Sequence, residues 1–195
     1  MATYKSIKYN IDYAGKAGSL MPLATFTSDG SDSNATFTSG INSTYDEYWC
    51  ICNDIHSESD FKYFGFQGTT DGSNFNITTT STHFISNHAE ADNATGLSYE
   101  AGADVGQVTT TIPIVYGVGN DNDQSVSGII KIYNPSSTTY VKHWLSMMHT
   151  SLDNDRSSSS FASGYLNTAS AVTGFRFLFQ ADEIQGGTIQ LFGVI

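Results

Sequence analysis

Two aspartates in a glycine-flanked loop are the sharpest candidate for metal chemistry in this sequence. Asp121 and Asp123 flank Asn122 within the turn-rich segment Gly119–Gln124. Oxygen ligands at alternate positions are what Ca²⁺ prefers, so the loop is a candidate cation site. The loop lacks the central glycine and the twelfth-position glutamate of an EF-hand, however. The alternative, which we favour, is a hairpin turn whose Asn and Asp side chains bond to the local backbone.

Several histidines form a second candidate site. His83, His88 and Glu90 are close in the sequence, and a fold could bring His56 near them. A transition-metal site needs imidazoles at a spacing that fixes their geometry, and no His-x-x-x-His pair on a helix is present. We therefore interpret these residues as solvated or hydrogen-bonded histidines and predict no metal site.

Arrangements for hydrolysis or phosphate transfer are not recognisable in the sequence. There is no Gly-x-Ser-x-Gly nucleophile elbow and no glycine-rich phosphate loop with its lysine. The carboxylate pairs Glu58/Asp60 and Asp182/Glu183 lie in predicted turns, where solvated charge is the default interpretation. We predict a protein that is not an enzyme, with no catalytic residues and no cofactor.

Aromatic residues are the remaining candidates for a binding site. The chain has 11 Tyr, 12 Phe and two Trp, at Trp49 and Trp144. Most of them are expected to pack in the core or between sheets. Some could instead form platforms for sugars or for a partner subunit, because Tyr and Trp combine apolar area with a polar group. The sequence leaves both alternatives open.

The charge balance excludes two classes of partner. The net charge is −11, with only 8 Lys and Arg among 195 residues, so no basic footprint for nucleic acid exists. An anionic membrane surface would repel the chain, and no stretch approaches the ~20 apolar residues of a membrane span. Met1–Asn10 has no apolar region of the kind that opens a secretory signal peptide. We expect neither nucleic acid nor membrane as a partner.

The two cysteines are expected to be free. Cys50 and Cys52 occupy alternate positions of a predicted strand, where both side chains point to one face at a spacing that suits a disulfide poorly. We predict buried thiols in a protein that folds in a reducing cytoplasm.

Apolar and polar residues alternate with a period of two along most of the chain, which predicts that β-strands position the residues discussed above. Charged residues make up 14% of the chain, and Ser, Thr, Asn and Gly replace them, which favours strands and turns over long helices. Apolar runs with alternating faces are separated by turn signals, as at Ser28–Ser33, Thr69–Asn74, Leu152–Ser160 and Gln185–Gly187. In Thr80–Val105 the pattern is weakest, and short helical turns around Ala89–Asn93 are possible.

We predict an all-β, antiparallel β-sandwich of the jelly-roll type, with about ten strands and little helix. Residues 1–195 form a single domain without a linker or an internal repeat. Pro113 should lie at a strand start or on an edge strand. The predicted core contains Trp49, Ile51, Phe64, Phe66, Ile130, Ile132, Leu145, Phe177 and Leu191.

Several short segments carry a resemblance to known proteins. They are Ser43–Tyr48, Asn53–His56, Gly119–Gln124, Tyr133–Thr139, Val141–His143, Gly164–Thr168 and Ile184–Gly193. In this order they resemble a family of small virion proteins of marine tailed phages, including cyanophages. The resemblance runs from Thr38 onwards, and its closing Gly-Thr-Ile-x-Leu-Phe/Tyr-Gly pattern recurs in phage fibre and decoration domains. The resemblance implies a β-sandwich virion component, often oligomeric, and supplies no catalytic residues.

The function that we expect from this resemblance is structural. It is a non-enzymatic protein on the virion surface, assembled in the bacterial cytoplasm, and most concretely a capsid decoration or cement protein. Its partners would be the major capsid protein or tail proteins. The alternative is the tip of a tail fibre or head fibre that binds a host-surface glycan.

The N-terminal segment Met1–Lys16 is the candidate anchor for assembly. It carries Lys5, Lys8 and Lys16 against one aspartate, whereas the rest of the chain is strongly acidic. It could dock on an acidic neighbour or add as a strand to an exposed sheet edge. The equally open alternative is an ordinary first strand of the protein's own sandwich. We expect a homo-oligomer, and the resemblance favours a trimer.

Overall fold

A computed structural model describes residues 20–194, and within that range every regular element is a β-strand. No helix long and apolar enough to span a membrane occurs among these residues. The proposed N-terminal arm, Met1–Lys16, lies outside the described range. The strands are β1 (Leu20–Thr27), β2 (Ala35–Phe37), β3 (Glu47–Ser57), β4 (Lys62–Thr69), β5 (Thr79–Ala89), β6 (Thr95–Tyr99), β7 (Ile112–Val118), β8 (Val126–Tyr133), β9 (Lys142–Leu152), β10 (Arg156–Leu166), β11 (Gly174–Phe179) and β12 (Ile184–Val194).

Eight of these strands follow a jelly-roll path. The outermost pair is β1 with β12, and inside it are nested β2 with β11, β3 with β8, and β4 with β7, all antiparallel. Four nested pairs amount to one long hairpin, and further pairing of β12 with β3 and of β11 with β4 rolls that hairpin up. The antiparallel jelly roll predicted from the sequence is confirmed.

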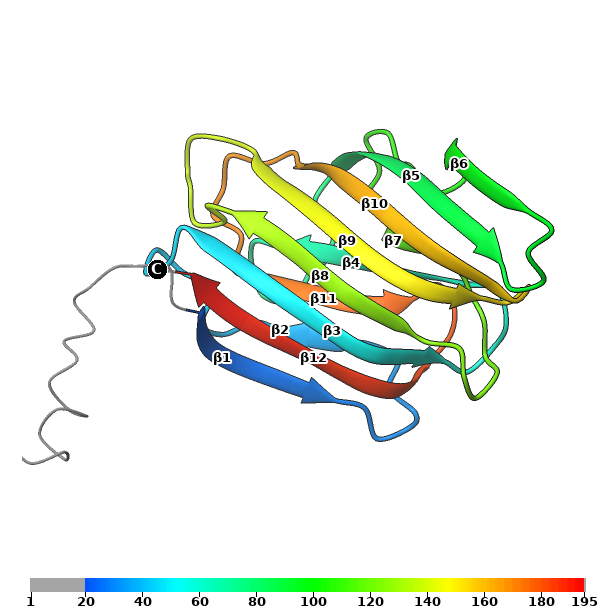
Figure 1. Ribbon diagram of the computed structural model, residues 1–195. Helices are drawn as coiled ribbons and strands as arrows, with labels where there is room; N and C mark the ends of the chain where they lie inside the picture. The colour runs from blue at the N-terminus through cyan, green and yellow to red at the C-terminus, as the bar shows by residue number, and fades with distance from the viewer. Residues whose placement is uncertain (1–19, 195) are drawn as a thin grey trace, which may run out of the picture.

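The rolled strands form two layers that face each other (Figure 1). The front layer begins in the order β1-β12-β3-β8, and the back layer has the order β2-β11-β4-β7. The layers meet where Val118 of β7 pairs with Leu152 of β9. Large apolar side chains fill the space between the layers, as in other β-sandwiches.

The remaining four strands widen the front layer. The β5–β6 hairpin is inserted between β4 and β7, and the β9–β10 hairpin between β8 and β11. Along its full length β10 pairs with β9 on one side and with β5 on the other, so the two insertions form one sheet. The front layer therefore continues past β8 as β9-β10-β5-β6, which we call the extension (Figure 1).

An aromatic cluster forms the centre of the core. The Phe177 ring of β11 lies 6.2 Å from the rings of Phe37, Phe64 and Phe66, and Phe66 meets Trp144 of the front layer edge-on at 4.9 Å. Six predicted core residues are buried: Phe64, Phe66, Ile130, Ile132, Phe177 and Leu191.

Three predicted core residues are wrong. Trp49 and Ile51 are partly exposed on the outer face of β3, and Leu145 is exposed on the outer face of β9. In β3 the buried positions are Tyr48 and Cys50, one residue out of step with the prediction. Both faces of this strand carry apolar side chains, so alternation alone did not decide which face turns inward.

Other boundaries also differ from the prediction. The sheet has twelve strands where about ten were predicted. The Ser-rich run Ser157–Ser160, predicted as a turn, belongs to β10. Residues 90–94 form a tight turn between β5 and β6 with no helix. Gln185–Gly187 lies within β12 at register shifts, where Gly187 has φ +99°. Pro113 is the second residue of β7, as predicted.

Cys50 and Cys52 are free and buried on the inner face of β3, as predicted. Burial disfavours the charged thiolate, so it raises the pKa of Cys50 and raises that of Cys52 to about 12.

We predict that neither thiol reacts with an alkylating reagent while the protein is folded. At neutral pH the thiolate, which is the nucleophile, is nearly absent, and both sulfur atoms are enclosed. Mass spectrometry of the labelled chain should show no added mass under native conditions and two labels after unfolding without reductant. A native label, or no label after unfolding, would contradict the assignment.

Candidate functional site

The structure does not bring the candidate metal ligands together. His83 is on the inner face of β5 and His88 on its outer face, where His88 pairs with Asp92 at 3.2 Å. His56 lies on β3, and its Nε2 is 3.1 Å from the carbonyl oxygen of Asp121. Among residues 20–194, no three His, Cys, Asp or Glu side chains form a group that could hold a metal.

The Asp121 loop has the bonding of a turn. The backbone N–H of Gln124 donates to the Asp121 carbonyl at 2.8 Å, and the Asp121 N–H donates back to the Gln124 side chain at 3.1 Å. The Gln124 amide also donates to the carbonyl of Leu152, which ties the loop to β9. The exposed side chains of Asp121 and Asp123 find no third carboxylate or imidazole ligand in the described chain.

The candidate hydrolytic residues hold loops together. Although burial acts to raise the pKa of Asp182, hydrogen bonds from the Ser57 and Ser59 hydroxyls and from the Ser59 N–H outweigh it and lower that pKa. The Ser157 hydroxyl lies 2.9 Å from His149 Nε2 on the protein surface. No carboxylate within the described range bonds to the second ring nitrogen of His149, so the triad geometry is not formed there.

The outer face of the extension is the most unusual surface of the molecule. One row of neighbouring side chains crosses it from β6 to β9 and continues over β8 to β3, according to the strand register. Within the row the rings of Phe84 and Phe161 stack at 5.1 Å, and Phe84, Tyr99 and Met147 are 44%, 56% and 48% exposed. The row consists of Tyr99, Phe84, Phe161, Met147, Ile129 and Ile51.

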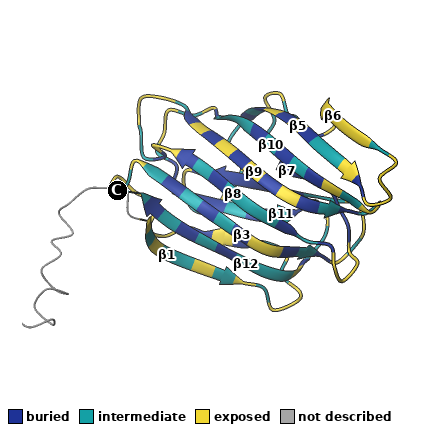
Figure 2. Ribbon diagram, viewed as in Figure 1, coloured by how far each residue is buried: buried dark blue, intermediate teal, exposed yellow. Residues whose placement is uncertain are grey.

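Two further apolar side chains lie beside this row. Leu97 of β6 is 76% exposed and Leu145 of β9 is 37% exposed. Figure 2 shows the result as exposed bands on β9 and a fully exposed β6. We call the outward side chains of β9, β10, β5 and β6 the extension face. Contiguous exposed apolar area of this kind is typical of an interaction surface.

Charge is missing from the extension face. Its other side chains are Ser, Thr, Tyr and three histidines, His88, His143 and His149, and it contains no Asp, Glu, Lys or Arg. In a chain of net charge −11 this is a marked depletion. Enrichment in aromatic residues and Met with depletion of charge is the composition of a protein–protein interface core.

Both faces of the extension mix polar and apolar side chains. Its inner face buries Trp144, Met148 and Leu166 beside polar groups, and the side chains of His83, Ser146 and Ser160 and the Trp144 indole N–H have no hydrogen-bond partner. A sheet with one solvated face normally places polar side chains outward. The extension also exposes Leu, Met and Phe among the Ser, Thr and His of its outer face, and apolar side chains on both faces are the pattern of a sheet that is covered on both.

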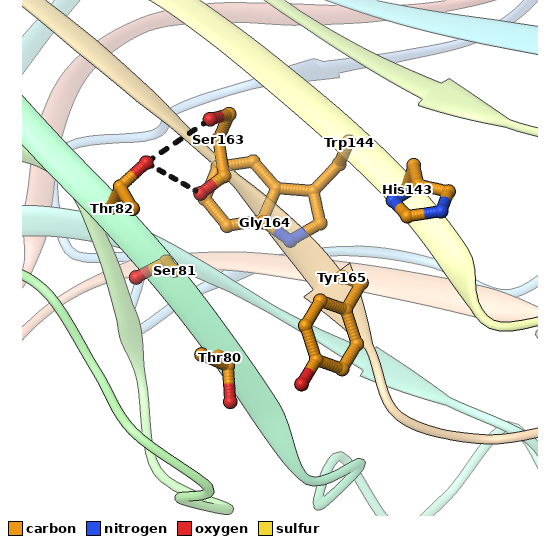
Figure 3. A pocket seen from close by; sticks show the side chains of 8 residues that line it. All are labelled: Thr80, Ser81, Thr82, His143, Trp144, Ser163, Gly164 and Tyr165. Carbon is orange, nitrogen blue, oxygen red and sulfur yellow. Dashed lines mark hydrogen bonds between the residues drawn. The ribbon is translucent and has the colours of Figure 1, made fainter.

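A shallow hollow interrupts the extension face at Gly164 (Figure 3). Its volume is about 280 Å³, and its lining includes His143, Tyr165, Thr80 and Thr82. The Thr82 and Ser163 hydroxyls are 3.2 Å apart. The hollow thus combines two rings with several hydroxyl groups and carries no charged side chain.

Comparison with known proteins adds no assignment: no family model, no curated protein and no solved structure matches the chain.

Sequence reasoning missed most of the extension face. The Ser-rich start of β10 was predicted as a turn, so Phe161 had no strand to place it. Met147 and Leu145 were assigned to one face of their strand, but that face turns outward. The register between two inserted hairpins, which aligns Phe84 with Phe161, leaves no signal in a single sequence.

We predict that His83 makes folding pH-dependent. Burial lowers its pKa from 6.5 to about 4, so between these values the unfolded chain binds a proton that the folded chain does not. The free energy of unfolding should therefore fall by about 3 kcal/mol as the pH drops through this window.

The measurement is urea denaturation at pH 7, 5.5 and 4 for the wild type and for His83→Gln. The substitution should flatten the pH dependence by this amount. The matched control is His143→Gln, which removes an exposed histidine with no carboxylate partner among the described residues and should leave the slope unchanged. Equal slopes in all three proteins would show that His83 does not titrate as predicted.

Proposed function

We propose that this protein is a non-enzymatic structural component of the surface of a tailed-phage virion, most concretely a capsid decoration or cement protein. The observation that carries a structural role is the extension face, which is exposed, contains no Asp, Glu, Lys or Arg and carries a continuous row of apolar side chains. Its mechanism is the burial of this face against a neighbouring virion subunit, repeated in many copies. The virion location rests on the resemblance of the sequence to small phage virion proteins.

The physical argument is one of burial. Removing apolar surface from water contributes roughly 25 cal/mol per Å², and a face without charges avoids the cost of desolvating ions. The exposed apolar row of the extension supports this role, since covering the outer face would give β9 and β10 a second apolar contact. The acidic remainder of the surface favours solubility and discourages non-specific association.

The fold is compatible with this proposal but does not select it. Jelly rolls occur in viral capsid proteins, in lectins and in cupins, so function must be argued from the surface. The free, buried thiols are consistent with assembly in a reducing bacterial cytoplasm.

We predict that Met147→Lys removes the protein from virions. The lysine would place an unpaired charge in the centre of the extension face, and burying it against a partner is costly. Copies per virion, measured by quantitative mass spectrometry of purified particles, should fall at least about tenfold, equivalent to about 1.4 kcal/mol of binding free energy.

The matched control is Thr25→Lys, an exposed position on β1 that lies opposite the uncharged Gln190 and away from the extension. It should leave occupancy unchanged, and both variants should keep the wild-type melting temperature. Full occupancy of the Met147→Lys protein would overturn the proposed contact. Absence of the wild-type protein from virions would overturn the location.

A second candidate function is a fibre tip that binds a host-surface glycan. The hollow lined by Tyr165, His143 and Thr80 favours it, because a ring beside hydroxyl groups suits a sugar. Its uncharged lining selects a neutral glycan.

If the glycan function holds, Tyr165→Ala should weaken binding of the neutral host polysaccharide at least about tenfold, since the substitution removes the phenol ring of the hollow. Isothermal titration calorimetry measures it, with Tyr133→Ala, 38% exposed before substitution, as the control. Hundreds of copies per virion favour decoration, and a few tens or fewer favour the fibre. Undetectable binding by the wild type would remove this candidate.

A further inference from the structure

The described sheets have four lateral edges, and three of them carry features that block pairing with another chain. Pro22 and a register shift interrupt β1, and β2 is only three residues long. Pro113 lies in β7, whose pairing with β4 is irregular at two places. Prolines, bulges and short length are the usual means by which proteins protect an exposed edge.

The fourth edge, β6, has none of these protective features. Its sequence, Thr-Gly-Leu-Ser-Tyr, contains no proline and no charged residue, and its register with β5 is regular. All five residues are exposed. It is the last strand of the extension, and its far side faces solvent (Figure 1). An open edge of this kind is a template for another strand.

The hydrogen bonds to β5 show which backbone groups of β6 are free. Glu100 N–H donates to the His83 carbonyl, and Ala89 N–H donates to the Ala94 carbonyl. Bonding residues alternate in an antiparallel pair, so Gly96 and Ser98 also face β5. The N–H and C=O groups that point away from the sheet are those of Thr95, Leu97 and Tyr99.

We propose that β6 of one copy pairs antiparallel with β6 of a second copy about a two-fold axis at Leu97. In this register Leu97 bonds to Leu97 of the second copy, and Thr95 bonds to Tyr99. Each outward N–H then meets a carbonyl of the other copy. No other register centred on a residue of the strand satisfies all three outward-facing residues at once.

The charges of the strand ends agree with this register. Glu100 falls opposite Ala94 of the second copy, so within residues 94–100 no carboxylate is placed opposite a carboxylate, although each chain carries a net charge of −11. The nearest carboxylates are those of Asp92, which pairs with His88, and Asp104, which accepts a hydrogen bond from the Tyr99 hydroxyl. Since the strand itself contains no charged residue, this edge is a place where two acidic copies can approach.

A two-fold contact of this kind uses the same strand on both copies and leaves it without a free side, so the assembly closes as a dimer. The pairing joins two extension layers edge to edge, which places their apolar rows in one surface. The inference deepens the proposed function, because this doubled surface is what a neighbouring subunit would cover. The dimer itself does not depend on a virion location, and it differs from the trimer that the resemblance implies.

The first test is the molar mass of the purified full chain by light scattering and sedimentation. We expect twice the 21.1 kDa of one chain for the wild type at micromolar concentration. Leu97→Pro removes an outward N–H without breaking a bond to β5, so it should give a monomer with an unchanged circular dichroism spectrum. The control Leu145→Ser alters the same face away from the edge and should remain a dimer.

The second test is a cross-link that reports the register. Directly opposed, hydrogen-bonded residues have Cα atoms about 5.5 Å apart, which is within the range of a disulfide. Leu97→Cys should therefore form a covalent dimer on mild oxidation. Ser98→Cys points to the opposite face of the strand and should not, and the native Cys50 and Cys52 are buried and do not compete.

A monomeric wild type, a trimer, or a dimer that survives Leu97→Pro would overturn the proposal. Loss of the dimer in Leu145→Ser alone would show that the extension face, and not the edge, is the contact. Efficient cross-linking of Ser98→Cys would exclude the register. These results are independent of occupancy in virions, so failure of the dimer and failure of the proposed function are distinguishable.

Discussion

The contact between Phe177 and the rings of Phe37, Phe64 and Phe66 is the interaction on which the rest of the structure depends. These rings come from three strands of the back layer, and Phe66 extends the cluster to Trp144 of the front layer. Removing a ring from such a cluster costs about 3–5 kcal/mol, a large part of the stability of a single domain. The cluster fixes the back layer against the front layer, and so it sets which face of every strand turns inward.

The extension follows from this constraint. Because β9 and β5 are seated through Trp144 and His83 on the inner side, their outer residues must face away from the core, whatever their polarity. An exposed apolar row on the outer face, over an inner layer in which several polar groups lack a hydrogen-bond partner, is an unusual combination for a solvent-facing sheet. Two properties favour binding of a partner to this sheet. The jelly roll keeps the outer face rigid, and the side chains of that face carry no charge that would have to be desolvated.

The alternating pattern of the sequence was sufficient to predict the antiparallel sandwich, its aromatic centre and the burial of Cys50 and Cys52. Phe64 and Phe66 alternate with Gly65 and Gln67, and Phe177 follows Arg176, so their face was favoured as the inner one although Tyr63 and Leu178 lie opposite. The prediction failed for Trp49, Ile51 and Leu145, because both faces of their strands are apolar and a shift of one residue exchanges them. It also failed for Ser157–Ser160, whose composition is that of a turn although its neighbours on both sides make it a central strand.

What the sequence determined by itself is therefore the class of the fold, the acidic charge, from which we predicted no nucleic-acid partner, and the lack of any recognisable catalytic motif. These properties depend on composition and on neighbours along the chain. The extension face and the open edge at β6 were decided only by the tertiary structure. They arise where two hairpins inserted far apart in the chain pair with each other, and a single sequence does not encode which distant strands align. That register alone brings Phe84 against Phe161 and leaves Leu97 at the end of the sheet.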